Sequence, residues 1–203
     1  MLKTGWFAFG FAVAMLAGCA GIESDVRASL PDASAFDAGP RTYAFAHSPV
    51  APAGEDAARY ESAIADALAK HDFDAVPDAR ARLRVSVAYD THAEPVSVLD
   101  EACKAQDECQ ASQPSLSFRW LGRKRFVHSL TLRFFDRATG LEIYKVSASS
   151  RDGEAQSPAT AACLVQSAFA QMPYGGSSRW HVRLRRAQDG NALSVVSVTP
   201  DSR

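Results

Sequence analysis

Near the centre of the chain, large apolar residues recur at every second position over a stretch long enough for a strand. From Phe126 to Phe134, one set of alternate residues is Phe, His, Leu, Leu and Phe, and the other is mainly polar. A period of two places each set on its own face of a β-strand. A turn sequence at 136–140 follows, and residues 142–149 alternate again. The pattern predicts a β-hairpin with Gly140 at positive φ, one face of which must be covered.

Two segments have the spacing of amphipathic helices, which could cover that face. Residues 56–70 are the first, and we expect Phe73, just beyond it, to pack back onto the helix. Pro158 opens the second predicted helix, which runs to about Met172 and cannot continue through Pro173. The apolar stripes consist of Ala57, Tyr60, Ile64, Ala67 and Leu68 in the first helix, and Ala161, Leu164, Val165, Ala168, Phe169 and Met172 in the second.

Further strands are predicted at 41–46, 83–89, 117–120, 179–186 and 192–198, the last two forming a closing hairpin within 174–203. Two helices and a largely antiparallel sheet bury their apolar faces best as a two-layer α+β sandwich. A chain of 203 residues is long enough for one such domain. We therefore expect a single α+β domain over 41–203, with both helices packed on one face of the sheet and a polar, cysteine-bearing insertion at 91–115.

The first 18 residues have the organisation of an export signal. Lys3 precedes an uncharged run from Gly5 to Leu16. Twelve residues are too few to span a hydrocarbon core of ~30 Å, so a signal peptide over 1–18 is a better interpretation than a transmembrane helix. The run ends in Leu-Ala-Gly-Cys at 16–19, which resembles the lipobox of bacterial lipoproteins. The alternative is a secreted protein in which Cys19 has no special role.

The lipobox resemblance implies that Cys19 is lipidated. In that family the thiol receives diacylglycerol, the signal is cleaved before the cysteine, and the new amino group is acylated, for example with palmitate. Two or three acyl chains anchor a protein stably. Ala20 stands where an inner-membrane retention signal usually has Asp, so the resemblance implies the periplasmic face of the outer membrane. Residues 19–40 are rich in Ala, Ser, Asp and Gly, and we expect them to be a lipidated, flexible tether.

Three cysteines remain after Cys19, and the periplasm permits disulfides. Cys103 and Cys109 enclose five residues in a polar segment, a spacing that a local disulfide can close. We predict this pair, with Cys163 buried in the second helix as a small hydrophobic residue. The alternative pairs Cys163 with one of the other two. The chain has no CxxC motif of the redox or zinc type.

No motif in the chain identifies a reaction. The five histidines, at 47, 71, 92, 128 and 181, form no HExxH pair, and neither a GxSxG elbow nor a phosphate-binding GxxxxGK[ST] loop occurs. His128 lies on the predicted core face of its strand, where a hydrogen-bonded structural histidine is the favoured interpretation. We expect no metal, no cofactor and no enzymatic activity. A hydrolase, the third hypothesis, requires a cleft with a paired nucleophile and base.

Charge is distributed unevenly along the chain. Residues 19–118 carry eight basic and 17 acidic side chains, whereas residues 119–203 carry 13 and six. Behind an export signal we expect no nucleic acid as a partner, which leaves anionic lipid head groups, lipopolysaccharide phosphates or an acidic protein surface. The basic residues of the second half form two groups: Arg119, Arg123, Lys124 and Arg125, interleaved with aromatic residues, and Arg179, Arg183, Arg185 and Arg186. The alternative is that these basic residues lie on solvated strand faces and bind no partner.

Several short segments of the chain occur in a characteristic order. They are the lipobox, Phe36, Arg-Thr-Tyr-Ala-Phe at 41–45, Ala-Leu-Ala-Lys-His-Asp-Phe at 67–73, Leu-Arg-Val-Ser-Val at 83–87, Asp-Arg-Ala-Thr-Gly at 136–140 and Phe-Ala-Gln-Met-Pro at 169–173. In this order they resemble a group of bacterial periplasmic lipoproteins that is known mainly as a domain of unknown function. The resemblance covers about residues 26–173. Similar proteins usually have Gly at the position of Asp72, and the family supplies no catalytic residues.

These observations lead to two hypotheses about function. The first is a non-enzymatic outer-membrane lipoprotein that acts as an accessory or interaction module of the cell envelope. The second is an accessory lipoprotein for lipid or lipopolysaccharide transport, in which the segment 118–126 contacts phosphate groups.

Overall fold

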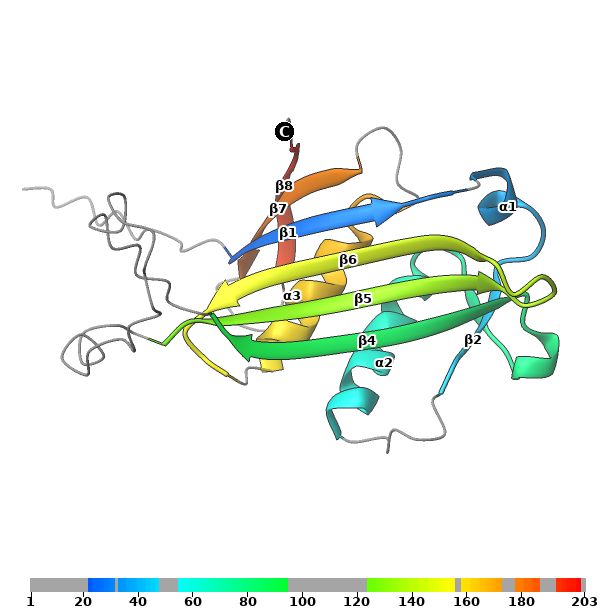
Figure 1. Cartoon of the computed structure of the whole chain (residues 1–203), viewed down its shortest axis with the longest axis horizontal. Helices are drawn as coiled ribbons and strands as arrows, with labels where there is room; N and C mark the ends of the chain where they lie inside the picture. Colours follow the sequence, from blue (N-terminus) through cyan, green and yellow to red (C-terminus); the bar gives the residue numbers. More distant parts are fainter. Residues whose placement is uncertain are drawn as a thin grey trace, which may run out of the picture.

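The computed structural model of the chain describes residues 22–31, 33–47, 55–94, 124–155, 158–172, 178–186 and 193–201. These residues form one eight-stranded sheet in the order β3-β2-β4-β5-β6-β1-β7-β8 (Figure 1). The strands are β1 Ile22–Ser29, β2 Thr42–Phe45, β3 Asp74–Ala75, β4 Leu83–Ala93, β5 Phe126–Asp136, β6 Glu142–Asp152, β7 Arg179–Arg186 and β8 Leu193–Pro200. The helices are α1 Ala33–Asp37, α2 Glu55–Ala69 and α3 Pro158–Phe169, with a 3₁₀ turn η1 at Asp78–Arg80.

The sheet is largely antiparallel. Only β2 pairs in parallel, with β3 on one side and β4 on the other, and the remaining neighbours from β4 to β8 are antiparallel. Helix α3 contacts β1, β5, β6, β7 and β8, and α2 packs along α3. The structure therefore confirms the predicted α+β class with a largely antiparallel sheet.

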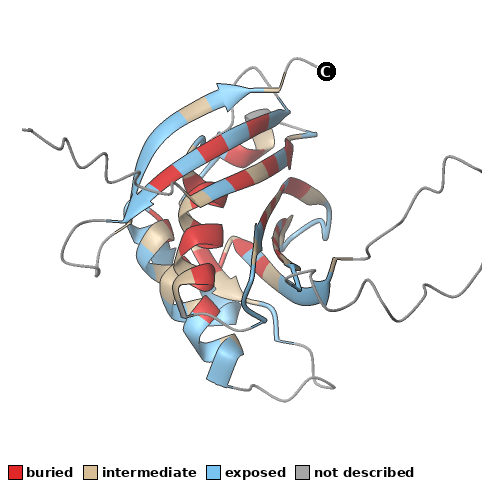
Figure 2. Ribbon diagram, turned by 90° about the vertical axis from the view of Figure 1, so that its left-hand side faces the viewer, coloured by how far each residue is buried: buried red, intermediate tan, exposed pale blue. Residues whose placement is uncertain are grey.

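The predicted central hairpin is formed by β5 and β6. His128, Leu130, Leu132 and Phe134 are buried, as the alternation predicts. Gly140 has a φ of 72°, which a glycine adopts without strain. The turn is held by Asp136, whose Oδ1 accepts hydrogen bonds from the backbone N–H groups of Ala138 (3.0 Å) and Thr139 (2.9 Å). Buried residues also alternate with more exposed ones along β1 and β7, and Figure 2 shows this pattern on the ribbon.

The first predicted helix, α2, ends as its sequence indicates. Its buried residues are Tyr60, Ile64 and Leu68. The Phe73 N–H donates to the Leu68 carbonyl (3.1 Å) and the Asp72 N–H to the Ala69 carbonyl (3.2 Å), which is the Schellman pattern. Asp72 has a φ of 62°, a conformation that glycine adopts at the lowest cost. Phe73 is buried, as predicted.

The predicted tether over 19–40 is wrong from residue 22 onwards. Residues 22–29 form β1, which lies between β6 and β7 inside the sheet (Figure 1). Val26 is buried there. Phe36 of α1 packs on Tyr144, and the centroids of the two rings are 5.0 Å apart. The composition hid this strand because its inward positions are the small residues Ser24, Val26 and Ala28, and its outward positions are charged. The folded unit therefore begins well before residue 41.

The predicted insertion at 91–115 is also wrong at its start, because β4 continues to Ala93, which pairs with Phe126. The closing hairpin is confirmed as β7 and β8, and β7 pairs with β1. Several predicted features lie outside the described residues: the signal at 1–18, Cys19, the strand at 117–120, Cys103, Cys109, Arg119 and Arg123.

Candidate functional site

Charged side chains surround an open cleft at one end of the sheet, where β1, β5 and β8 begin and β4, β6 and β7 end. The cleft has a volume of about 1280 Å³. Ile22 at the start of β1 and Ala159 and Thr160 in the first turn of α3 form part of its wall. We call it the charged cleft. Its charged lining consists of Glu23, Asp25, Lys124, Arg125, Arg151, Asp152, Glu154, His181, Arg183 and Arg186.

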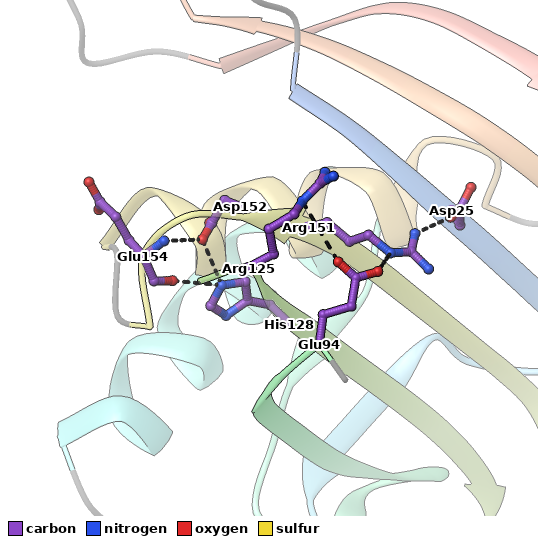
Figure 3. Close-up of polar contacts among 7 residues, drawn as sticks. All are labelled: Asp25, Glu94, Arg125, His128, Arg151, Asp152 and Glu154. Atoms are coloured by element: carbon purple, nitrogen blue, oxygen red, sulfur yellow. Dashed lines mark hydrogen bonds and ion pairs between the residues drawn. The ribbon is translucent and has the colours of Figure 1, made fainter. Parts of the chain in front are cut away.

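Arg151 connects several strands at this cleft (Figure 3). Its Nε donates to Glu94 Oε1 and its Nη1 donates to Asp25 Oδ2, both at 3.2 Å. The Nε of Arg125 lies 3.7 Å from Glu94 Oε2. These four residues come from β1, β6, the end of β4 and the start of β5. Because the side chains are partly exposed, each pair adds only about 0–1 kcal/mol to stability, but together they hold two guanidinium groups in place.

A second set of side-chain contacts crosses from β1 to β7. Glu23 and Arg183 are direct cross-strand neighbours, and Arg183 Nη2 donates to Glu23 Oε1 at 2.8 Å. Asp25 and His181 are also direct neighbours, and their side chains are in contact. The opposite charges of Glu23 and Arg183, placed across an antiparallel pair, favour this register. The outer face of β7 is therefore less basic than its sequence indicates.

His128 lies below the cleft and is 2% exposed. Its Nε2 is 3.0 Å from both Asp152 Oδ1 and the Glu154 carbonyl oxygen, and its Nδ1 is 2.9 Å from Thr91 Oγ1. Because both partners of Nε2 are acceptors, this nitrogen carries the proton, and in the neutral ring Nδ1 accepts from the Thr91 hydroxyl. The prediction of a hydrogen-bonded structural histidine is confirmed.

Asp152 joins this histidine to helix α3. Its Oδ1 also accepts the Glu154 N–H at 2.8 Å, and its Oδ2 accepts the Thr160 hydroxyl at 3.3 Å. The carboxylate therefore ties the end of β6 to the first turn of α3. Thr91 and His128 form a hydroxyl–imidazole pair of the kind that the hydrolase hypothesis requires, and the histidine is 2% exposed.

A smaller cavity of about 240 Å³ includes His128 and Thr91 in its lining. Tyr60 of α2 and Tyr89 of β4 stack at its wall, with ring centroids 4.6 Å apart and planes inclined by 18°. Burial raises the pKa of the Tyr60 hydroxyl above its ordinary value, with a smaller contribution from nearby Asp56. The Tyr60 hydroxyl therefore stays protonated at neutral pH and serves as a packing group with a polar end.

The charged cleft brings the two predicted basic groups together. Lys124 and Arg125 of the first group and Arg183 and Arg186 of the second line it. Neither Lys124 nor Arg186 forms an ion pair with another described residue. Of the residues in the predicted anion-binding patch, Lys124 and Arg125 thus lie in the cleft, with acidic residues interleaved, and anion binding there stays a prediction.

Cys163 of α3 lies at the wall of the cleft with its side chain directed into the core. It is 1% exposed and its thiol is free. Its Sγ lies 3.5 Å from Ser24 Oγ. Burial raises the pKa of the thiol above its ordinary value, so Cys163 is a small buried hydrophobic residue, as predicted.

Sequence reasoning missed the acidic half of the site. Asp25 was hidden in the predicted tether, and the pairing of Glu94 with Arg151 depends on a strand register that periodicity does not reveal. Within the described residues, no three His, Cys, Asp or Glu side chains are grouped as metal ligands, and no helix is long and apolar enough to cross a membrane.

Residues 28–174 match a protein family described as a domain of unknown function, DUF4136. The chain belongs to this family. The DUF4136 match extends from the end of β1 past α3, and it leaves the β7–β8 hairpin and most of β1 outside. The predicted resemblance to a domain of unknown function, over about 26–173, is thereby confirmed. No curated protein matches the chain in sequence.

Three solved structures are similar to this DUF4136 protein at low sequence identity. A PDZ domain protein from Parabacteroides distasonis has 14% identity and a TM-score of 0.48, and the alignment covers 81% of this chain and 40% of that one. A PelC dodecamer from Paraburkholderia phytofirmans has 14% identity, a TM-score of 0.42 and coverages of 72% and 95%. A variant of that PelC protein has 15% identity with the same TM-score of 0.42. The chain thus spans 40% of the length of the PDZ domain protein.

Proposed function

We propose that the protein is a lipid-anchored lipoprotein of the outer membrane, on its periplasmic face, whose two-layer α+β domain is a non-enzymatic interaction module of the envelope. The anchor is Cys19, in the lipobox-like sequence Leu-Ala-Gly-Cys at 16–19. The interaction surface is the charged cleft.

The observation that carries this proposal is the way the cleft holds its arginines. Arg151 is fixed by carboxylates from two different elements, and Arg183 is fixed by Glu23 on the neighbouring strand. A guanidinium has five N–H donors, so donors beyond those in the ion pairs are available to a partner. Side chains that are already oriented lose less conformational entropy when a partner binds.

Site-specific photo-crosslinking in the native envelope tests this function. A photoreactive amino acid is placed at Arg186 in the cleft or at Leu141, which is 65% exposed at the opposite end of the sheet. We expect a reproducible adduct from position 186 that is absent from position 141. No adduct from 186, or the same adducts from both positions, would contradict the cleft as the interaction surface.

The second candidate is an accessory of lipid or lipopolysaccharide transport, and Lys124 and Arg125 in the cleft favour it. A transport accessory holds a lipid molecule within the protein, whereas an interaction module does not. The transport hypothesis therefore predicts a stoichiometric lipid that stays bound through detergent extraction, detected by native mass spectrometry.

A further inference from the structure

The short distance along the chain between Cys19 and β1 limits where a lipid anchor can lie. Ile22 is the first residue of β1 and is part of the wall of the charged cleft. Consecutive Cα atoms are 3.8 Å apart, so the Cα of Cys19 lies within about 11 Å of the Cα of Ile22. With a lipid on Cys19, this end of the sheet is held at the bilayer surface.

The side chains at this end suit lipid head groups. Lys124, Arg125 and Arg186 line the cleft, and Arg binds phosphate oxygens through two parallel N–H groups. The cleft lining includes none of the exposed large apolar side chains of the described residues, which are Tyr89, Leu141, Val195 and Val196. Contact with the polar head groups is therefore favoured over insertion into hydrocarbon.

The carboxylates at the same end are largely engaged by the fold. Glu94 and Asp25 bind Arg151, Glu23 binds Arg183, and Asp152 binds His128. In contrast, Lys124 and Arg186 have no ion-pair partner among the described residues. Among the described residues of the cleft, the basic groups without an ion-pair partner are thus Lys124 and Arg186, and Glu154 is the carboxylate without one.

We propose that the charged cleft is the membrane-facing surface of the protein, with Lys124, Arg125 and Arg186 contacting lipid phosphates. This inference rests on the proposed lipidation of Cys19 and names the partner of the proposed interaction surface. Strands β5 and β6 then rise from the bilayer. Since β6 has 11 residues at a rise of 3.2–3.4 Å each, the β5–β6 turn stands roughly 30 Å above the surface.

A lipid-borne quencher measures this orientation. The full chain is produced with its signal, purified in its acylated form and reconstituted into vesicles that contain anionic lipids and a head-group quencher. A fluorescent amino acid replaces either Lys124 or Leu141. We expect strong quenching at position 124 and little at position 141. Equal quenching, or stronger quenching at position 141, overturns the proposal.

Charge reversal tests the role of the basic residues, with the probe at Glu154, an exposed residue of the cleft wall. The test variant is Lys124→Glu with Arg125→Glu, and the control is Arg137→Glu with Lys145→Glu, exposed positions toward the other end of the strands. Each basic residue near an anionic surface strengthens its attraction about fivefold. Quenching of the probe at Glu154 gives the ratio of protein with its cleft on the bilayer to protein with its cleft away from it. We expect this ratio to fall at least 20-fold in the test variant and to stay unchanged in the control. Equal loss in both, or none in either, overturns the proposal.

Acylation is measured on the same samples by mass spectrometry of the N-terminal peptide. If Cys19 carries no lipid, the proposed function fails together with this inference. If Cys19 is acylated but position 124 is not quenched, only the orientation is wrong and the anchored interaction module stands.

Discussion

His128 is the side chain whose removal should cost the fold most among the polar groups of the site. It is 2% exposed, and it links β5 to Thr91 of β4 and to Asp152 and Glu154 beyond β6. Replacing it with alanine leaves a cavity. It also leaves the Asp152 carboxylate, the Glu154 carbonyl and the Thr91 hydroxyl without their hydrogen bond to the imidazole. We predict that His128→Ala folds but is substantially less stable.

The loss of stability in His128→Ala can be worked out from the hydrogen bonds that the two ring nitrogens make. A hydrogen bond to a charged group contributes about 1.5–3 kcal/mol and a neutral one about 0.5–1.5 kcal/mol. Asp152 and Thr91 are partly accessible to water, which offsets some of the loss. Together with the cavity, the cost is about 3 kcal/mol.

Urea unfolding followed by circular dichroism measures this cost. With a slope of about 2 kcal/mol per molar urea, the midpoint should fall by about 1.5 M. His128→Gln keeps an N–H donor near the position of Nε2, so it should lose about half as much. His128→Asn places its amide near Nδ1 and cannot reach Asp152, so it should lose nearly as much as alanine.

A double-mutant cycle separates the contact with Asp152 from general packing. The coupling between His128→Ala and Asp152→Asn should be about 2 kcal/mol. The reasoning is refuted if His128→Ala costs less than about 1 kcal/mol, or if glutamine is no better than asparagine.

Three further predictions concern other elements. Asp72→Gly should leave the midpoint of thermal unfolding unchanged or raise it, whereas Asp72→Val should lower stability by about 1–2 kcal/mol, because residue 72 has a positive φ. Cys163 should resist thiol reagents in the native protein at neutral pH and react fully in denaturant, as mass spectrometry of labelled peptides can show, because the thiol is buried and its pKa is raised. A hydrogen bond from the Thr139 backbone N–H lowers the pKa of the Asp136 carboxyl below its ordinary value of 3.8. The stability that Asp136 contributes is therefore present above that value and is lost as the pH falls through the lower folded-state pKa. Asp136→Asn should unfold with a weaker dependence on pH in this acid range, measured by acid titration.

The fold was predictable where local periodicity and turn chemistry agree. The alternation around Leu130 and Leu132, the turn closed by Gly140 and the helix ending before Phe73 each signal one element. Strand β1 was missed because its inward side chains are small and its outward side chains are charged, so its composition is that of a linker. Its place between β6 and β7 is decided by pairing with distant strands.

The site was predictable only in its basic half. Lys124 and Arg125 stand out as a charge cluster, and the late arginines as another. Their meeting in one cleft depends on β7 pairing with β1, and the carboxylates that hold Arg151 depend on strand register. His128 was correctly placed in the core because its position follows from alternation, whereas its partner Asp152 lies 24 residues away in the sequence.

The central claim is that Cys19 anchors this protein to the membrane directly before the folded sheet begins. Mass spectrometry of the N-terminal peptide, purified from the native outer membrane, tests it most directly. The account predicts a chain that begins at Cys19, with acyl groups on both its thiol and its amino group. A peptide that contains unmodified Cys19, or one that retains the residues before it, would contradict the claim.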